Sequence, residues 1–301
     1  MTRAGPAFMR FCLQGRLLRW LGQALSRLSP RQTARIAFAL SRMPALNASR
    51  RRIAARNIAL CFADLSPAQR EALLAQALAD NTLGALDTLR AWFAPPPRLR
   101  DAGSMRGLEH LHAARAQGRG VIVIGAHYDS IEIAMRLVAQ ASGEPMPILV
   151  RRYNNPCFER EIDAGRRRYC GDTYDKKDVA GFVEAVRAGR SVFYVPDQNA
   201  NRRTVFVPFY GVPAATLGAI GGVVARSGGV PLLMWCRRDA DGYYDIDLQP
   251  AWPDWPGQDE TENAARYMAW IEQRSRQAPS QYLWVHRRFK TRPPGEPDVY
   301  R

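Results

Sequence analysis

The first 63 residues contain no aspartate and no glutamate, but they contain twelve arginines. This segment therefore carries a charge of +12, and the remaining 238 residues carry only about +3 of the total of +15. A basic segment without acidic residues is typical of a surface that binds an anionic partner, such as nucleic acid, an acidic membrane or an acidic substrate. The charge distribution thus limits the class of partner before any motif is considered.

Features of membrane-spanning and disulfide-rich proteins are also missing. No run of about 18 uncharged apolar residues occurs, so a membrane-spanning helix is not expected. Arginines at positions 10, 16 and 19 interrupt the apolar region near the N-terminus, which argues against a cleaved signal peptide. The five cysteines are scattered, with no C-x-x-C pair. We therefore expect neither a disulfide framework nor a zinc site. The pattern is instead typical of a protein in a reducing compartment.

Within the basic segment, residues 8–28 have the pattern of an amphipathic helix with an apolar face and arginines on most other positions. Such a helix fits the plane of a membrane interface, where each arginine near an anionic bilayer contributes roughly 1 kcal/mol. The alternative is an ordinary surface helix packed on the domain. Further helices are predicted at 31–43 and at 66–92, where Ser66 is a suitable N-cap and Pro67 takes the first helical position. We expect residues 1–99 to form a helical, basic, membrane-associating region.

From about residue 100 short apolar runs alternate with helical stretches. Strands are predicted at 120–126, 146–151, 191–196, 230–237 and 243–249, and helices at 107–117, 131–141, 156–168, 177–188, 216–227 and 261–277. This alternation predicts βαβ units and a mostly parallel sheet flanked by helices, so residues 100–301 are expected to form an α/β domain. Sites in such folds lie at the carboxyl ends of the strands.

The stretch VIVIGAHYDSIEIA, residues 121–134, joins the first buried strand to a helix and contains a candidate general base, His127. On one continuous helix His127 and Glu132 would lie about 140° apart, so they can meet only across the strand–helix turn. A carboxylate from Asp129 or Glu132 would fix the imidazole tautomer and leave the other ring nitrogen as a base. The alternatives are a structural histidine, and a helix cap for Asp129 or Ser130. Ser130 is not expected as a nucleophile, because the G-x-S-x-G elbow is missing.

Several segments, in one collinear order from about residue 50 to the C-terminus, resemble the late acyltransferases of lipid A biosynthesis, of the lauroyl and myristoyl type. The sequence GAHYDSIE resembles their H-x4-E variant of the glycerolipid acyltransferase motif. Similar segments are RRIAARNIALCFADLSPAQREAL (51–73), VRRYNNPCFEREI (150–162), GRSVFYVPDQNANRRTVFVPFYGVPAATLGAI (189–220) and AWIEQRSRQAPSQYLWVHRRFKTRPPGEP (269–297). The resemblance implies a glycerolipid acyltransferase-like α/β fold.

The resemblance also implies the reaction and its residues. A fatty acyl chain would pass from acyl carrier protein, or from acyl-CoA, to a hydroxyl of a lipid A precursor, with no cofactor and no metal. His127 would be the general base and Glu132 its orienting acid. The implied substrate- or phosphate-binding residues are Arg151, Asp197, Arg152 and Arg203. Because the Arg-Arg doublet leaves the register open by one position, Arg151 and Arg152 both stay candidates for the functional arginine.

The implied setting is the cytoplasmic face of the inner membrane of a Gram-negative bacterium, with a peripheral, monomeric enzyme. Its partners would be acyl carrier protein, the lipid acceptor and an anionic membrane surface. The alternative acceptor is another phospholipid, a glycolipid or a polyene-type product. Nucleic acid is not expected, because no DNA- or RNA-binding motif is present. Further basic residues are candidates for a phosphate- or carrier-binding surface with Arg151, or for solvated surface charges: Arg202, Arg203, Arg287, Arg288 and Lys290.

Overall fold

A computed structural model describes residues 13–99 and 101–301. Its N-terminal part contains the helices α2 (Leu13–Leu25), α3 (Pro30–Ser41), α4 (Pro44–Cys61) and α5 (Pro67–Phe93), followed by the 3-10 turn η1 (Pro96–Leu99). Ser66 caps α5 as predicted, because its side chain accepts a hydrogen bond from the Gln69 amide and the Gln69 side chain accepts one from the Ser66 amide. The first residues of the amphipathic helix predicted at 8–28 lie outside the described residues.

A seven-stranded sheet forms the centre of the rest of the chain, in the order β1-β9-β8-β2-β5-β3-β4. The strands are β1 (Gly103–Arg106), β2 (Val121–Ile124), β3 (Ile148–Val150), β4 (Thr173–Asp175), β5 (Ser191–Tyr194), β8 (Val230–Arg238) and β9 (Tyr244–Pro250). The five strands from β8 to β4 are parallel, while β9 pairs antiparallel with β8 and β1 runs parallel to β9. All five predicted strands are present, so the predicted α/β class with a mostly parallel sheet is confirmed.

The hairpin of β6 (Thr204–Phe209) and β7 (Val212–Leu217) forms a separate two-stranded sheet. The prediction of a helix from residue 216 is therefore wrong at its start, and α10 (Ile220–Ser227) begins four residues later. Thr216 pairs with Val205 across the hairpin and is buried, so strand pairing replaces the predicted start of the helix.

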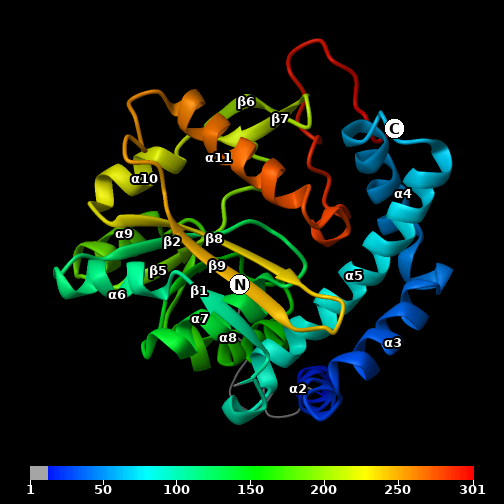
Figure 1. Ribbon diagram of the computed structural model, residues 1–301, viewed down its shortest axis with the longest axis horizontal. Helices are drawn as coiled ribbons and strands as arrows, with labels where there is room; N and C mark the ends of the chain where they lie inside the picture. The colour runs from blue at the N-terminus through cyan, green and yellow to red at the C-terminus, as the bar shows by residue number, and fades with distance from the viewer. Residues whose placement is uncertain (1–12, 100) are drawn as a thin grey trace.

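Helices cover both sides of the sheet (Figure 1). They are α6 (Leu108–Ala116), α7 (Ile131–Ser142), α8 (Pro156–Cys170), α9 (Val179–Arg187) and α11 (Glu260–Ser275), with the short turn η2 (Pro279–Gln281). Figure 1 shows α7 and α8 below the sheet, and α10, α11 and the β6–β7 hairpin above it. Helix α5 contacts α7 and α8 and crosses the end of the molecule toward which β8 points. The carboxyl edge of the sheet therefore faces α5.

The hydrophobic core continues from α4 and α5 into the sheet, from Ala54 to Phe289. At one point the packing is very close, since a Cβ added to Gly84 of α5 would lie 2.4 Å from the carbonyl oxygen of Asp129. Only glycine lets the helix approach the turn after β2 at this distance.

The predicted division of the chain into a helical region (1–99) and an α/β domain (100–301) stays a prediction.

The described cysteines are of two kinds. Cys61, Cys170 and Cys236 are free thiols in the interior. Cys157 is disulfide-bonded, which the scattered cysteine pattern did not predict.

Candidate active site

His127 lies in the turn between β2 and α7, at the carboxyl edge of the sheet. The turn is held from three sides. The Gly125 amide donates to the Tyr194 carbonyl at 2.9 Å, and the Tyr267 hydroxyl donates to the Gly125 carbonyl at 2.5 Å. The His127 carbonyl accepts from the Leu283 amide at 3.0 Å. The His127 side chain keeps 28% of its surface exposed, so the ring is fixed in place but still open to a ligand.

The hydrogen-bond partner of His127 is Asp197. Strands β2 and β5 are parallel neighbours in which Ile124 pairs with Tyr194. His127 follows Ile124 by three positions, and Asp197 follows Tyr194 by three positions, so the two residues lie side by side. The Asp197 Oδ2 accepts from the His127 amide at 2.9 Å, and its Oδ1 lies 2.5 Å from Nδ1 of the imidazole. The Tyr282 hydroxyl donates to the same Oδ2 at 3.2 Å. Equal offsets from two strand ends identify this pair only once the two strands are known to be neighbours.

The electrostatics of the pair favour an ionised carboxylate. Burial disfavours the charged form of Asp197, but the charge and hydrogen bonds of His127, with the charge of Arg288, outweigh burial and lower the Asp197 pKa. The carboxylate then holds the proton on Nδ1, and Nε2 is left as the basic nitrogen. Asp197 is completely buried behind His127 and therefore does not reach a ligand, which corrects its predicted place among the substrate-binding residues.

Glu132 has other partners. Its Oε1 accepts from Nε of Arg166 at 3.0 Å and from the same guanidinium's Nη2. Its Oε2 accepts from the Tyr169 hydroxyl at 2.5 Å and from the Trp92 indole at 2.9 Å. The prediction that Glu132 contacts His127 is wrong, because the first turn of α7 directs this carboxylate toward α8 and α5 while the imidazole faces the end of β5. Sequence reasoning missed these three partners of Glu132.

The Glu132 cluster is also ionic. Burial disfavours the charged carboxylate, but the charge of Arg166 and the hydrogen bonds from Arg166, Tyr169 and Trp92 lower the pKa of Glu132. The Arg166 guanidinium lies over the Trp92 ring, 5.2 Å from its centroid. Glu132 therefore joins α7 to α8 through a buried ion pair, and to α5 through the hydrogen bond from Trp92.

Asp129, the other acid near His127, faces α5. Its Oδ1 accepts from the Asn81 amide at 3.1 Å, and its Oδ2 has no hydrogen-bond partner among the described residues. Burial raises the pKa of Asp129 well above its usual range, and the charge of Asp80 adds to this, while the Asn81 hydrogen bond and Arg238 oppose it. Burial thus favours the neutral form of Asp129, and its side chain contacts Asn81 of α5 rather than His127.

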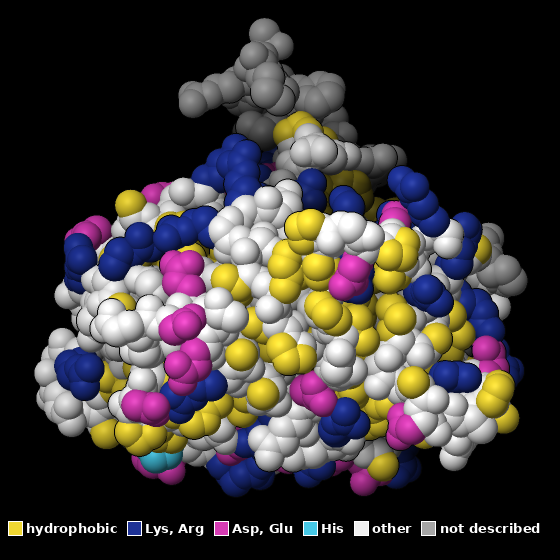
Figure 2. Space-filling model, turned by 90° about the horizontal axis from the view of Figure 1, so that it is seen from above, with side chains coloured by type: hydrophobic (Ala, Val, Ile, Leu, Met, Phe, Trp, Pro, Cys, Tyr) yellow, Lys and Arg dark blue, Asp and Glu magenta, His cyan; other side chains and the backbone are white. Residues whose placement is uncertain are grey.

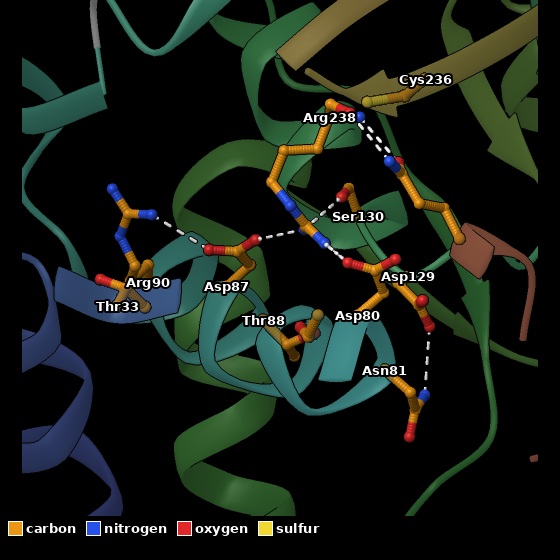
Figure 3. A network of polar contacts seen from close by, with 12 residues as sticks. Thr33, Asp80, Asn81, Asp87, Thr88, Arg90, Asp129, Ser130, Cys236 and Arg238 are labelled. Carbon is orange, nitrogen blue, oxygen red and sulfur yellow. Dashed lines mark hydrogen bonds and ion pairs between the residues drawn. The ribbon is translucent and has the colours of Figure 1, made fainter. Parts of the chain in front are cut away.

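Figure 3 shows the ionic network beside Asp129. Arg238, at the end of β8, donates to Asp80, Asp87 and the Ser130 hydroxyl, each at 3.1 Å. The network ties α5 to the carboxyl edge of the sheet and to the turn that carries His127. Ser130 occupies the N-cap position of α7 but makes no capping hydrogen bond with its side chain, so neither predicted cap is present.

A cavity of about 640 Å³ opens beside His127. Its wall combines apolar side chains with charged ones, among them Ile131, Met135, Ile148, Glu132, Arg151 and Arg166. Apolar surface with a few cations suits an amphiphilic anionic ligand. No group of three or more His, Cys, Asp or Glu residues able to hold a metal ion occurs in the part of the chain that the structure describes.

The two candidate arginines differ in their contacts. Nη1 of Arg152 donates to Glu159 at 2.9 Å and to Asp163 at 2.6 Å, and its Nη2 donates to the Thr173 carbonyl at 2.8 Å. Arg151 is exposed, lines the cavity and has no side-chain partner within residues 13–99 and 101–301. Arg152 is thus engaged in holding its own loop, and Arg151 is the arginine that is free to bind a ligand.

The other predicted basic residues do not gather around Arg151. The cavity beside His127 is lined by none of Arg202, Arg203, Arg287, Arg288 and Lys290. Arg203 pairs with Glu260 at 3.4 Å and, with Arg202, lines an adjoining cavity of about 520 Å³. Arg288 is buried and donates to the Ala215 carbonyl and the Thr216 hydroxyl, each at 2.6 Å, so it holds the hairpin.

Comparison with known proteins gives the family. The family model described as bacterial lipid A biosynthesis acyltransferase matches residues 12–291. Over 257 residues the chain is 35% identical to the lipid A biosynthesis palmitoleoyltransferase of Escherichia coli (strain K12), covering 83% of this chain and 82% of the relative. The lauroyltransferase of the same strain is 33% identical over 256 residues, with the same two coverages. The myristoyltransferase is 29% identical over 260 residues, 85% of this chain and 80% of the relative.

All three relatives are named for lipid A biosynthesis, and none of these findings supports the alternative acceptors. The match covers most of the chain, including the turn with His127 and the strand end with Asp197. The α/β fold and the histidine–carboxylate pair beside a cavity agree with acyl transfer to a hydroxyl. The chain belongs to the bacterial lipid A biosynthesis acyltransferase family and is an O-acyltransferase.

Proposed function

We propose that this enzyme moves a fatty acyl chain from acyl carrier protein to a hydroxyl of a lipid A precursor, with His127 as the general base. The contact of 2.5 Å between Nδ1 of His127 and the buried Asp197 carboxylate, beside the 640 Å³ cavity, is the observation that supports it best. A hydroxyl is a poor nucleophile until a base takes its proton during attack. The reaction requires no cofactor.

In the proposed step, the acceptor hydroxyl attacks the thioester carbonyl, a C–O bond forms and the hydroxyl proton passes to Nε2 of His127. Asp197 stabilises the imidazolium while the tetrahedral intermediate exists. The C–S bond then breaks, and the imidazolium returns the proton to the leaving thiolate. No acyl-enzyme forms.

Arg151 is the proposed anion-binding residue of the acceptor site. Its guanidinium lies in the wall of the cavity and suits a phosphate of the lipid A precursor, which it can bind through two parallel hydrogen bonds. Glu132 is assigned a positioning role, because it holds the wall of the same cavity without touching His127.

The chemical identity of donor and acceptor is tested by product mass. Purified enzyme is incubated with a lipid A precursor and, in parallel, with lauroyl-, myristoyl- and palmitoleoyl-acyl carrier protein or the matching acyl-CoA. All three chains are tested because the three named relatives differ in chain and are similarly related to this protein. We expect a product heavier by one acyl group, and none with the His127→Ala variant. Transfer that is undiminished in this variant, or no product with any donor, would refute the proposal.

We place the enzyme on the cytoplasmic face of the inner membrane, bound to the bilayer surface. Helices α2 and α3 expose large apolar side chains, among them Leu17 (53%), Trp20 (62%) and Phe38 (50%). Arginines share these helices, as expected of helices that lie in a membrane interface. Among the described residues, no helix is both long and apolar enough to cross a bilayer.

Replacing Leu17 and Trp20 together with alanine is expected to weaken binding to phosphatidylglycerol vesicles about a hundredfold or more, because burial of each large apolar side chain contributes roughly 1.5–3 kcal/mol. Vesicle co-sedimentation measures the effect, and an unchanged melting temperature shows that the fold is intact. Equal sedimentation of variant and wild type would show that α2 does not bind the bilayer.

A further inference from the structure

A second cavity, of about 270 Å³, reaches His127 from the side of α4 and α5. It shares only Thr88, His127 and Ile131 with the 640 Å³ cavity. Its other walls come from α4, α5, the C-terminal segment and the turn after β2, where Tyr128 and Asp129 line it. An enzyme that joins two large substrates at one base needs an approach to that base for each of them. Two cavities that meet at the imidazole provide this.

The wall of the second cavity is polar along one side. Arg50 of α4 lines it, is exposed and has no side-chain partner within the described ranges. The Asn81 amide and the Thr88 hydroxyl lie on α5 along the same cavity. Arg50 can bind a phosphate, and Asn81 and Thr88 can hydrogen-bond to amide groups. The cavity therefore suits a narrow ligand that carries a phosphate and amide groups and whose far end reaches His127.

Outside this cavity, α4 carries a strongly basic face, defined as Arg52, Arg56 and the neighbouring Arg287. These three arginines line a hollow of about 450 Å³ on the outer side of α4. None of them forms an ion pair with an acid in the described part of the chain: Arg56 donates to a backbone carbonyl, and Arg287 lies over a tyrosine ring. Figure 2 shows dark-blue basic side chains along the right-hand side, the side on which α4 lies in Figure 1.

The side chains exposed on the basic face of α4 favour a protein partner over a membrane surface. The large hydrophobic side chains that the structure shows as exposed lie on α2 and α3 and in loops, and none lies on residues 47–61 of α4. A helix that binds a bilayer presents apolar side chains together with its cations. A face with cations and no large exposed apolar group instead matches an acidic, soluble surface.

We propose that an acidic acyl carrier protein docks on the basic face of α4, and that its phosphopantetheine arm enters the 270 Å³ cavity past Arg50 and presents the thioester to His127. The proposal rests on the proposed function and adds the docking surface and the direction of entry. Arg50 binds the phosphodiester of the arm, whereas Arg52 and Arg56 contact acidic side chains of the carrier.

The test measures binding of fluorescently labelled carrier protein by anisotropy, with the arm attached (holo) and without it (apo). Arg52→Glu is expected to weaken binding of both forms about tenfold, and raised salt should reduce the difference because it screens exposed charges. Arg50→Ala is expected to weaken binding of the holo form only. Arg119→Glu is the matched control, since Arg119 is exposed and precedes β2, at the opposite edge of the sheet.

Equal weakening by Arg52→Glu and Arg119→Glu would overturn the docking surface. Weakened binding of Arg52→Glu to phosphatidylglycerol vesicles, with unchanged carrier binding, would make α4 a membrane contact instead. Loss of both holo and apo binding in Arg50→Ala would refute the arm's path past Arg50. These measurements need no turnover, so a failure of docking is distinct from a failure of acyl transfer, which is read from product mass.

Discussion

Asp197→Asn is expected to lower kcat about 10³-fold while KM for both substrates changes little. An amide does not stabilise the imidazolium that forms during attack. Its NH2 group can also donate to Nδ1, which moves the ring proton to Nε2 and removes the base. The Asp197 carboxylate contacts both the amide and the ring of His127, so no other described acid replaces it.

Steady-state acyl transfer with saturating donor and acceptor measures this loss, and His127→Ala sets the floor. Tyr282→Phe is the matched control, because it removes one hydrogen bond to Asp197 and keeps the charge. We expect that control to lose about ten- to hundredfold, in line with the roughly 1.5–3 kcal/mol of one hydrogen bond to a charged group. If Asp197→Asn retained more than a tenth of wild-type kcat, the pairing would not be catalytic.

Glu132→Ala is expected to lower the free energy of unfolding by about 3–5 kcal/mol, because it leaves the Arg166 guanidinium buried without its counter-charge. The Tyr169 and Trp92 donors lose their acceptor as well. Acyl transfer activity is expected to decrease as well, because Glu132 no longer holds the side chains that line the acceptor cavity in place. Chemical denaturation measures the stability, and the double variant E132Q/R166M should recover part of it because no buried charge is left unpaired.

The pH dependence of this effect has a definite sign. The folded pKa of Glu132 lies below its usual value of 4.5, so the stability it contributes is complete above that value and is lost as the pH falls through the lower folded pKa. Glu132→Gln should therefore flatten the loss of stability on the acid side.

Asp129→Asn is the control for the variants of Asp197 and Glu132. Because burial raises the pKa of Asp129 and favours its neutral form, a neutral isostere should change stability by less than about 1 kcal/mol and leave kcat nearly unchanged. A loss of activity in Asp129→Asn that equals the loss in Glu132→Gln would mean that the roles of the two acids are misassigned.

The local parts of the site were predictable from the sequence. A fully apolar run followed by Gly-Ala-His placed His127 at the carboxyl end of a buried strand, and the structure has β2 and the turn there. Alternating apolar runs and helical stretches gave the α/β class, since periodicity reports directly on which faces are buried. The strands β1 and β4 were missed because four and three residues carry too little pattern to be recognised. The six-residue strands β6 and β7 were missed because each contains a proline, which is unusual inside a strand.

The fold class, the family and the position of the candidate base follow from the order of the amino acids. The folded structure is needed to show that Asp197, 70 positions from His127, is its partner, that Glu132 pairs with Arg166, and that Arg151 rather than Arg152 is free. Spacing along the chain describes contacts within one helix or one turn. Which strands lie side by side, and which buried charges then face each other, depends on the packing of the whole sheet against α5 and α8.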